Sequence, residues 1–448
     1  MAKSVKVNII TKETIKPSSP TPQHNRLINL SLFDQLNFAM STPVILFYPS
    51  LKNVKKINIQ KQQSEKLKLS LSEALNIFYP LAGHVVNNSF VECNDYGIDY
   101  VEAKIDCTIS EIFEQPDHDL LSKLIHVELN SVLTGAIIQV NFFSCGGLAI
   151  GVSLSHKITD AASLVIFLMN WAAKSLSVAS TSSLIPHFVA DTIIPSLKDP
   201  LILPPPPSLR MPKCKTNRFV FMASKVSALK AKAASVHVQN PTRVEAVTAF
   251  IWKCLMNITK SKQSELFARE SVVIQAVNLR KRFVTPLPHN FVGNLSGKFL
   301  AKTKVGNDLE LSNLVSLLRQ GLDRVSEDIA NLGQTATNFG GILKFAKDFG
   351  EMHNKDNVDL YTFTSLCGFP FYEIDFGWGN PKWAIATNLV LKNYIVMIDT
   401  KDGKGIEVWM SLGEEDMDLF ERNEELLEFA CINPSVSYGD IKAHPSCL

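Results

Sequence analysis

The sequence lacks the motifs of the commonest hydrolytic, nucleotide-binding and metal-dependent enzymes. It has no HExxH zinc motif, no GxSxG nucleophile elbow, no P-loop and no GxGxxG that opens a helix. Its ten histidines and its acidic residues never take the spacing of metal ligands. The sequence therefore predicts none of these enzyme classes and no metal site.

Cysteine pairs of the CxxC type and a large net charge are also missing. None of the eight cysteines forms such a pair, and the formal net charge is only +2. In a chain of 448 residues we expect reduced thiols and a cytoplasmic protein. So small a net charge does not indicate a protein that binds nucleic acid. The N-terminus has no apolar core before a cleavage site, so no secretory signal is expected. Nothing suggests a coiled coil or an exposed apolar helix, so we expect a monomer.

Only one stretch is long enough and poor enough in charge to raise the question of a membrane span. Residues 131–155 contain no charged side chain over 25 positions. They do contain Gln139, Asn141 and several serines and glycines, and apolar residues alternate with small ones at the end of the stretch. This pattern predicts two buried strands joined by a turn, and no membrane partner.

The chain has enough apolar residues for more than one core. Hydrophobic residues make up 46% and charged residues 20%, as in folded globular proteins, and about 150 residues per domain suggests two or three domains. Residues 194–215 are rich in proline, including the run from Pro204 to Pro207. Because proline fixes φ and removes a backbone donor, this stretch is predicted to be an extended linker between domains 1–193 and 216–448.

Hydrophobic periodicity predicts helices and strands in both halves without a regular βαβ rhythm. Helices are predicted over 64–78, 163–176, 242–252 and 416–431, the third of which opens with a capping box from Thr242 to Glu245. Strands are predicted over 96–101, 136–143, 148–155, 272–277, 394–398 and 406–412. The mixture favours an α+β fold.

His156 directly follows the last strand of the first half, in the sequence HKITD. The strand holds its backbone, and with a pKa near ~6.5 its imidazole is suited to take a proton from a substrate hydroxyl. A buried histidine bonded to a backbone carbonyl is the alternative. A hydrolase would need a nucleophile nearby, for which only Ser153 and Ser155 are candidates, and Ser155 should point to the other side of the strand.

Asp160 lies four residues after this histidine and has two possible roles. It either orients the imidazole or pairs with an arginine to brace the loop, and we favour bracing. Arg280 and Arg282 are the candidate partners, and a solvated basic turn is the alternative for both arginines.

The segment Asp375, Phe376, Gly377, Trp378 and Gly379 combines a charge, two glycines and two aromatic rings. Glycines permit a positive φ or a close backbone approach, so the segment is predicted to be a tight structural loop rather than a catalytic group. A kinase DFG motif is excluded because the glycine-rich loop, the VAIK strand and the HRD loop are missing.

In this order and about two hundred residues apart, HKITD and DFGWG resemble the HxxxD and DFGWG motifs of the plant BAHD acyltransferases, which transfer an acyl group from coenzyme A to an alcohol or amine. Further segments match along nearly the whole chain: LSLFD at 30–34, YPLAG at 79–83, CND at 93–95, QAVNLR at 275–280, GN at 293–294 and TS at 364–365. The residues that flank these segments are most similar to those of the vinorine synthase-like branch, which acylates alkaloids and other specialised metabolites.

The resemblance implies two chloramphenicol-acetyltransferase-like domains, each a mixed sheet flanked by helices, with a channel between them. It implies that His156 is the general base, that Asp160 is structural and that Thr364 contacts the oxyanion. Ser365 and Asn294 would lie toward coenzyme A. Acyl-CoA would be a co-substrate, acetyl-CoA by default, with no metal and no permanently bound cofactor.

Three positions depart from the family pattern. Ala161 stands where glycine is usual, His84 where arginine is usual, and Leu366 where the family has a tryptophan whose indole N–H contacts the oxyanion. The loss of one oxyanion donor can cost about 10²–10³ in rate. Either another group substitutes for the indole or the site is reshaped for another acceptor.

These observations together predict an acyl-CoA-dependent O-acyltransferase that acts by general-base catalysis. An alkaloid or terpenoid alcohol is the expected acceptor, with a sugar or sugar ester as the alternative. The change at Leu366 also leaves open a non-catalytic relative that binds a ligand.

Overall fold

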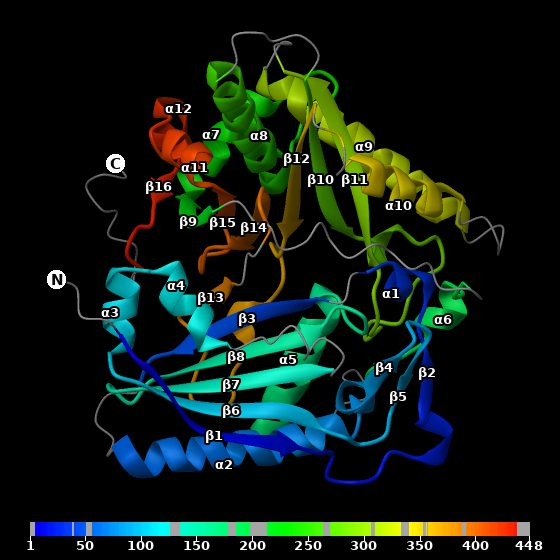
Figure 1. Ribbon diagram of the computed structural model, residues 1–448, viewed down its shortest axis with the longest axis vertical. Helices are drawn as coiled ribbons and strands as arrows, with labels where there is room; N and C mark the ends of the chain where they lie inside the picture. Colours follow the sequence, from blue (N-terminus) through cyan, green and yellow to red (C-terminus); the bar gives the residue numbers. More distant parts are fainter. Residues whose placement is uncertain are drawn as a thin grey trace.

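The computed structural model describes residues 5–37, 40–50, 56–125, 135–177, 185–197, 213–262, 269–305, 310–332, 340–352, 355, 357–387 and 391–436. These residues form two large sheets, one above the other in Figure 1, and a small third sheet beside the first. The mixture of sheets and helices is the predicted α+β class.

The first sheet has six strands in the order β1-β6-β7-β8-β3-β13. Its strands are β1 (Val7–Ile15), β6 (Ile98–Ile105), β7 (Ala136–Phe143), β8 (Leu148–Ser155), β3 (Ser41–Tyr48) and β13 (Trp383–Ala386). Helices α2 (Lys56–Leu75) and α5 (Ala161–Ser175) pack on each other, and the indole N–H of Trp171 donates to the Leu67 carbonyl at 3.2 Å. The short helices α3 (Ile109–Glu114) and α4 (His118–Leu121) lie on the side of the second domain in Figure 1.

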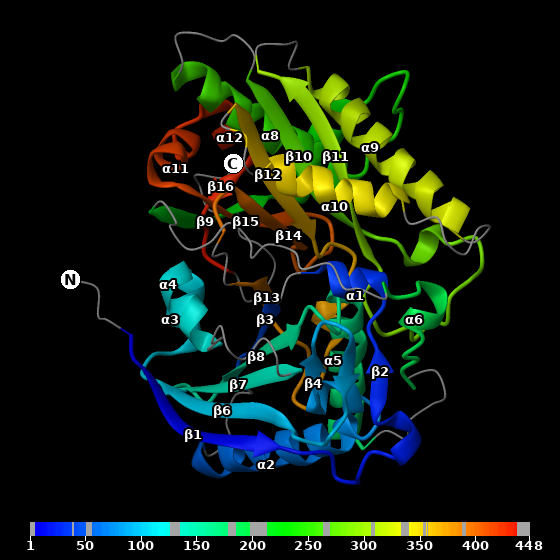
Figure 2. The same ribbon diagram turned by 45° about the vertical axis from the view of Figure 1, so that its right-hand side comes forward.

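The second sheet has seven strands in the order β11-β10-β12-β14-β15-β9-β16. They are β11 (Ser296–Lys304), β10 (Glu270–Asn278), β12 (Val358–Ser365), β14 (Tyr394–Asp399), β15 (Ile406–Gly413), β9 (Cys214–Phe221) and β16 (Cys431–Ile432). The helices of this domain are α7 (Ala223–Ala233), α8 (Arg243–Lys262), α9 (Leu311–Leu332), α10 (Gly340–Met352), α11 (Glu414–Glu421) and α12 (Glu424–Phe429). Figure 2 shows α10 crossing in front of the strands.

The two faces of the second sheet have different surroundings. In β14, Ile395 and Met397 belong to the core formed with the helices of the second domain. Val396 and Ile398, which alternate with them, pack into the core of the first domain. Because side chains alternate along a strand, this face of the second sheet points toward the first domain.

The small sheet and two short helices lie beside the place where the domains meet. The sheet has the order β2-β5-β4, with β2 (Leu27–Asn29), β5 (Phe90–Glu92) and β4 (His84–Val86). Helices α1 (Leu32–Leu36) and α6 (Ala190–Ile193) lie near it, on the right in Figure 1. Leu32 and Phe33 of α1 form a third apolar cluster with Leu295 and Ile329 of the second half.

The predicted elements are confirmed apart from their ends and one helix. The stretch 131–155 contains the antiparallel pair β7 and β8, and the capping box of α8 is present, with Thr242 N–H donating to Glu245 at 2.8 Å. The helix predicted over 416–431 is wrong as a single element. It is broken into α11 and α12 because Asn423 caps the second helix, its side chain accepting from Leu426 N–H.

The chain crosses between the sheets more than the predicted division at residues 194–215 implies. β13 belongs to the predicted domain 216–448, but it pairs with β3 at the edge of the first sheet. Phe376 and Trp383 pack into the core of the first domain for the same reason. Most of the proline-rich linker lies outside the described residues.

Two sequence expectations concern cysteine and membranes. Cys93, Cys107, Cys145, Cys214, Cys254 and Cys367 are free thiols. Cys431 is disulfide-bonded, contrary to the expectation of a reduced thiol.

Within the described part of the chain, none of the helices has the length and apolar character needed to cross a membrane.

Candidate active site

His156 lies where the first sheet meets the second domain. It follows β8 directly, and its backbone N–H donates to the carbonyl of Met40 at 2.9 Å, just before β3. Two adjacent strands therefore hold its backbone. The side chain is half-buried.

Among the described residues, the imidazole has a hydrogen bond to the second domain through the side chain of Asn294. Nδ1 of His156 lies 3.0 Å from Oδ1 of Asn294. The NH₂ group of the same amide donates to Oδ1 of Asp34 at 2.7 Å and to the carbonyl of His156 at 2.9 Å. Because a carboxylate and a carbonyl can only accept, the orientation of this amide is fixed by its neighbours.

This orientation decides which ring nitrogen of His156 carries the proton. Oδ1 of Asn294 is an acceptor, so Nδ1 of the imidazole must be the donor. In the neutral ring Nε2 then has the free lone pair. A histidine with this tautomer can accept a proton from a bound alcohol through Nε2.

Burial lowers the pKa of His156 below its usual value. The charge of Asp160 acts in the opposite direction, and the ammonium group of Lys298 lowers the pKa further. The net shift favours the neutral imidazole, which is the form that a general base needs.

Asp160 caps the N-terminus of α5 and pairs with Arg280. Nη1 of Arg280 lies 2.6 Å from Oδ2, and Nη2 lies 2.9 Å from Oδ1. Burial alone would raise the pKa of Asp160, but the charge and hydrogen bonds of Arg280 bring it below its usual value. Ser163 N–H donates to the same carboxylate at 3.0 Å, so its oxygens serve as a cap and an ion-pair partner.

The same pair holds the loop that carries Asn294. The backbone N–H of Leu295 donates to Oδ2 of Asp160 at 3.0 Å, and Nη2 of Arg280 donates to the Gly293 carbonyl at 3.0 Å. Both neighbours of Asn294 are therefore tied to the ion pair. These contacts are those expected of the bracing role predicted for Asp160. Its described hydrogen bonds reach the imidazole through the loop, and its charge also acts on the pKa of His156.

Arg282, the other predicted partner of Asp160, contacts a different element. Its Nη1 donates to Ser326 of α9 at 2.8 Å. Arg282 follows Arg280 by two residues in a 3₁₀ turn, so the two guanidinium groups diverge. Of the two candidate partners of Asp160, Arg280 is the one that pairs with it, whereas the described side-chain contact of Arg282 is with Ser326.

Thr364 lies on the face of β12 that points toward the first domain. It is in register with Val396, which packs into the first core. Its hydroxyl lies 3.3 Å from the hydroxyl of Tyr394, the first residue of β14. The pair places two hydroxyl groups on the face of the second sheet that points toward the first domain.

Ser365 and Leu366 end this strand. The Ser365 hydroxyl accepts from the backbone N–H of Cys367 at 3.2 Å. Leu366 is buried in the first core, and its N–H donates to the carbonyl of Met397 at 2.7 Å. The position where the family has an indole therefore carries an apolar side chain without a donor.

Lys298 occupies the same face of the second sheet. Lys298 pairs with Ala276 of β10, and Ile274 of the same strand pairs with Thr362 of β12. Because residues two apart on a strand share a face, Lys298 lies on the face that carries Thr362. Its Nζ is 5.2 Å from the centre of the Phe349 ring of α10. Burial lowers the pKa of this lysine, and its charge acts on His156.

The DFGWG segment packs on the first domain. Oδ1 of Asp375 accepts from the backbone N–H groups of Gly377, Trp378 and Gly379 at 2.7, 3.1 and 2.9 Å. Gly377 has φ +105°, a conformation that favours glycine. The Phe376 ring is fully buried and lies 4.8 Å from that of Trp171 in α5. These contacts are those of a structural loop.

The other two departures from the family pattern have ordinary local contacts. Nε2 of His84 lies 3.2 Å from Oε2 of Glu92 on the neighbouring strand, and Nδ1 lies 3.2 Å from the amide nitrogen of Asn94. Ala161 is the first residue of α5. Neither contacts the imidazole through a described hydrogen bond.

Sequence reasoning missed the roles of Asp34, Tyr394 and Lys298 at this site. Asp34 belongs to the LSLFD segment, and its contact with Asn294 joins residues 260 positions apart. The signal for Asp34 was the LSLFD motif itself. Tyr394 and Lys298 were hidden inside ordinary strand patterns.

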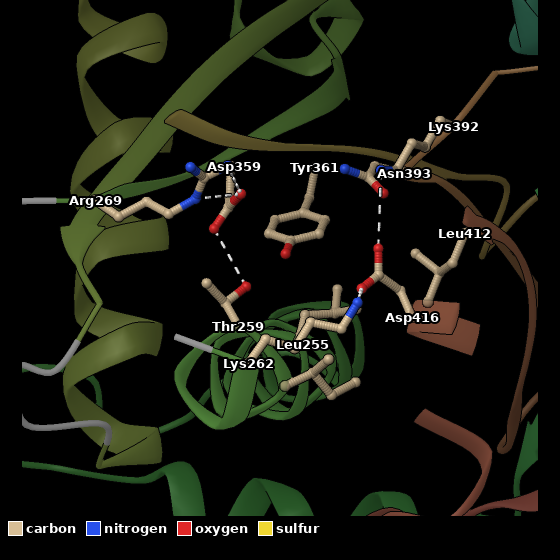
Figure 3. Close-up of a pocket in the computed structure, with 11 residues that line it drawn as sticks. Leu255, Thr259, Lys262, Arg269, Asp359, Tyr361, Lys392, Asn393, Leu412 and Asp416 are labelled. Atoms are coloured by element: carbon tan, nitrogen blue, oxygen red, sulfur yellow. Dashed lines mark hydrogen bonds and ion pairs between the residues drawn. The ribbon is translucent and has the colours of Figure 1, made fainter. Parts of the chain in front are cut away.

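A separate cavity of about 170 Å³ lies in the second domain, between α8 and the strands (Figure 3). Arg269 pairs with Asp359 at 2.6 Å, and Lys262 pairs with Asp416 at 2.7 Å. These four charged side chains of the cavity are therefore paired with one another. None of the predicted site residues lines it.

The serine nucleophile of a hydrolase finds no support in the described contacts of His156. The Ser155 hydroxyl accepts from the backbone N–H of Lys157 at 3.4 Å. The imidazole bonds to Asn294 instead, which is an amide and not a nucleophile.

Comparison with known proteins agrees with this geometry. The chain matches the model of the Transferase family over residues 5–427. Akuammiline synthase 1 of Alstonia scholaris is 38% identical over 428 residues, which cover 94% of this chain and 97% of that protein. Vinorine synthase of Rauvolfia serpentina is 35% identical over 421 residues, covering 91% of this chain and 94% of that protein.

Solved structures share the whole architecture. The crystal structure of vinorine synthase has a TM-score of 0.81 and 33% identity, and covers 96% of this chain and 99% of that chain. TRI101 of F. sporotrichioides, complexed with coenzyme A and T-2, has a TM-score of 0.71 at 18% identity, with 91% and 99% covered, and this likeness concerns the fold alone. The chain therefore belongs to the Transferase family of BAHD enzymes, and it is an acyl-CoA-dependent acyltransferase.

Proposed function

We propose that this enzyme transfers an acyl group from acyl-CoA to a hydroxyl group of an alkaloid, with His156 as the general base. The observation that carries the proposal is the hydrogen bond from Nδ1 of His156 to Asn294, because it leaves Nε2 free to accept a proton. The lowered pKa of His156 keeps the ring neutral at the start of the reaction.

The reaction proceeds in one addition and one elimination. Nε2 of His156 removes the proton of the acceptor hydroxyl as its oxygen attacks the thioester carbonyl carbon. The tetrahedral intermediate collapses as the carbon–sulfur bond breaks, and the imidazolium returns its proton to the thiolate of coenzyme A. The products are an ester and free coenzyme A, without a covalent acyl-enzyme.

Thr364 is the proposed donor to the oxyanion of this intermediate. The Tyr394 hydroxyl, 3.3 Å from that of Thr364, can donate to it, which leaves the Thr364 hydroxyl hydrogen free to point at the substrate. This pair would compensate in part for the donor that Leu366 lacks.

Asn294 and Ser365 were predicted to contact coenzyme A. The described contacts of Asn294 are instead with His156 and Asp34, and we propose that it positions the imidazole. For Ser365 the coenzyme contact stays a prediction. Acyl-CoA would enter a channel between the two domains from one side and the alcohol from the other.

The alkaloid class of the acceptor rests on the relatives. Vinorine synthase and akuammiline synthase 1 are each similar to this chain over more than nine-tenths of its length. Deacetylvindoline O-acetyltransferase of Catharanthus roseus is 35% identical over 440 residues, which makes acetyl-CoA the first acyl donor to test. We extend the proposal to a monomer that acts in the cytoplasm, to be tested by light scattering and by fractionation.

The release of free coenzyme A thiol tests the proposal. Purified enzyme is given acetyl-CoA, isobutyryl-CoA or malonyl-CoA with panels of alkaloid, terpenoid and sugar alcohols. Release that requires an alkaloid alcohol supports the proposal. Release with a sugar alcohol alone would replace the acceptor class, and binding of coenzyme A without release under any pair would favour a non-catalytic relative.

A further inference from the structure

Asp34 is a buried carboxylate that the mechanism above does not use. It lies in α1, a helix of five residues, and only 3% of it is exposed. Ser31 and Asp34 form a capping box, in which Oδ2 accepts from the Ser31 N–H at 2.8 Å and from its hydroxyl at 2.7 Å. This local role leaves the other carboxylate oxygen available.

Oδ1 of Asp34 contacts only Asn294 among its described hydrogen-bond partners. It accepts from the backbone N–H of Asn294 at 3.1 Å and from its side-chain NH₂ at 2.7 Å. All four described partners of the carboxylate are therefore donors, which is the set that an ionised carboxylate accepts. Asp34 thus reaches the imidazole of His156 through one amide group.

We propose that Asp34 is a positioning residue for acyl transfer, which holds the Asn294 amide in the one orientation that makes Nδ1 of His156 the protonated ring nitrogen. The inference rests on the proposed function, since it concerns the base of that reaction. It assigns a chemical role to the last residue of the LSLFD segment, which otherwise only begins a short helix.

The physical reason lies in the symmetry of the amide. Without an acceptor at Oδ1 of Asp34, the carbonyl of His156 is the one described acceptor left for the NH₂ group, so the orientation with oxygen and NH₂ exchanged becomes more populated. The NH₂ group would then face Nδ1 of the imidazole, which favours the tautomer with hydrogen on Nε2. In that tautomer Nε2 has no lone pair for the substrate proton, and catalysis stops.

One charged group faces Asp34 from another element. Nζ of Lys157 donates to the carbonyl of Gln35 at 3.1 Å and to Oδ1 of Asn88 at 2.7 Å, and lies 3.4 Å from the Asp34 carbonyl. Burial lowers the pKa of Lys157 to about 8, against the charge of Asp34. Burial also raises the pKa of Asp34 to about 6, so the ionised form that holds the amide is lost in mild acid.

The test is a double-mutant cycle between Asp34 and Asn294. The variants are Asp34→Asn, Asn294→Ala and the double variant, each compared with wild type in kcat and in KM for acyl-CoA. Because Asp34 acts through Asn294, Asp34→Asn should lower kcat by about 10- to 100-fold in wild type, and by less than about 2-fold when Asn294 is already alanine. KM for acyl-CoA should stay within about 2-fold of wild type in both backgrounds.

A matched control separates this role from helix capping. Thr108 and Glu111 form the same kind of capping box at α3, which lies on the left of the first domain in Figure 1, whereas α1 lies on the right. Glu111→Gln should lower stability to a similar extent as Asp34→Asn and leave kcat unchanged. Equal losses of kcat in the two variants would overturn the positioning role.

Two further measurements keep the inference testable. In ¹⁵N-histidine spectra, the signal of His156 is identified by its loss in His156→Gln. This signal should show a ring protonated on Nδ1 in wild type and a mixture of the two tautomers in Asp34→Asn. If Asp34→Asn does not fold, Ser31→Ala replaces it in the cycle, since it removes one donor to the same carboxylate. Its few-fold effect on kcat should likewise vanish in Asn294→Ala.

The outcomes distinguish the two proposals. If the fold-loss of kcat in the double variant equals the product of the two single losses, the positioning role is wrong while His156 remains the proposed base. The same holds if the tautomer of His156 is unchanged in Asp34→Asn. If His156→Ala itself keeps normal turnover, the proposed function fails first.

Discussion

Asp160 and Arg280 are 120 residues apart in the chain and form a two-point ion pair, with nitrogen–oxygen distances of 2.6 and 2.9 Å. The pair joins the helix after the catalytic strand to the loop that carries Asn294. The HxxxD motif therefore contains two residues with separate tasks. Its histidine is the proposed base, and its aspartate pairs with Arg280 and accepts from Leu295 N–H of the second half.

Asp160→Asn should lower the free energy of unfolding by about 3 kcal/mol, because it leaves the guanidinium group of a mostly buried pair without its charge partner. The side chains are 15% and 4% exposed for Arg280 and Asp160. Urea denaturation measures the change. Glu428→Gln, in the exposed pair with Lys232, is the control and should cost less than about 1 kcal/mol.

The pH dependence of this stability has a definite sign. The folded-state pKa of Asp160 is below its usual value, so its contribution is complete above the unfolded pKa of about 4. The contribution is lost as the pH falls through the folded pKa. A fully stable Asp160→Asn protein with normal affinity for coenzyme A and no turnover would instead assign Asp160 a direct chemical role.

Lys298→Met should raise the pKa of His156, since the ammonium group of Lys298 lowers it in the native protein. The acid limb of the profile of kcat/KM against pH should move to higher pH, because the free enzyme then holds its inactivating proton more tightly. Lys302→Met, on the same strand in an exposed pair with Glu270, should leave the profile unchanged. An unmoved limb in Lys298→Met would remove this lysine from the electrostatics of the site.

Thr364→Val should reduce kcat by about 10²–10³-fold with little change in KM, as the loss of an oxyanion donor does. Tyr394→Phe should have a smaller effect, since in the proposed arrangement its hydroxyl donates to Thr364 rather than to the substrate. Steady-state kinetics with the best acceptor measures both. If Tyr394→Phe were the more damaging change, the tyrosine would be the direct donor.

Gly377→Ala should destabilise the fold by about 1–3 kcal/mol, because φ at this position is +105°. Activity per folded molecule should be retained, since the DFGWG loop packs on α5 away from the imidazole contacts. Gly350→Ala in α10 is the control, as an added Cβ there meets nothing within 4 Å. Thermal unfolding compares the two, and lost kcat in a stable Gly377→Ala protein would give the loop a catalytic part.

Much of the local structure could be predicted from the sequence. The alternating residues of 148–155 and the charge-free stretch around them predicted the two buried strands that end at His156, and both are present. The family and the α+β fold of two sheet-containing domains were also correct. These features depend on periodicity and motif, which neighbouring residues encode.

What the sequence could not predict depends on contacts between distant segments. Nothing near Trp383 indicates that β13 crosses to the first sheet, because a short apolar strand fits either edge. Arg280 and Arg282 look alike in the sequence, and only the turn geometry separates their partners. The link from Asp34 to Asn294 spans 260 residues, and the LSLFD motif around Asp34 does not indicate its partner.

The role of His156 is tested most directly by the turnover of His156→Ala with acetyl-CoA and the best alcohol acceptor, beside a measurement of coenzyme A binding by calorimetry. We expect a folded protein that binds coenzyme A normally and produces free coenzyme A thiol at least about 10²-fold more slowly than wild type. Near-normal release by a folded His156→Ala protein would contradict the assignment of His156 as the base, and with it the role of the Asn294 amide.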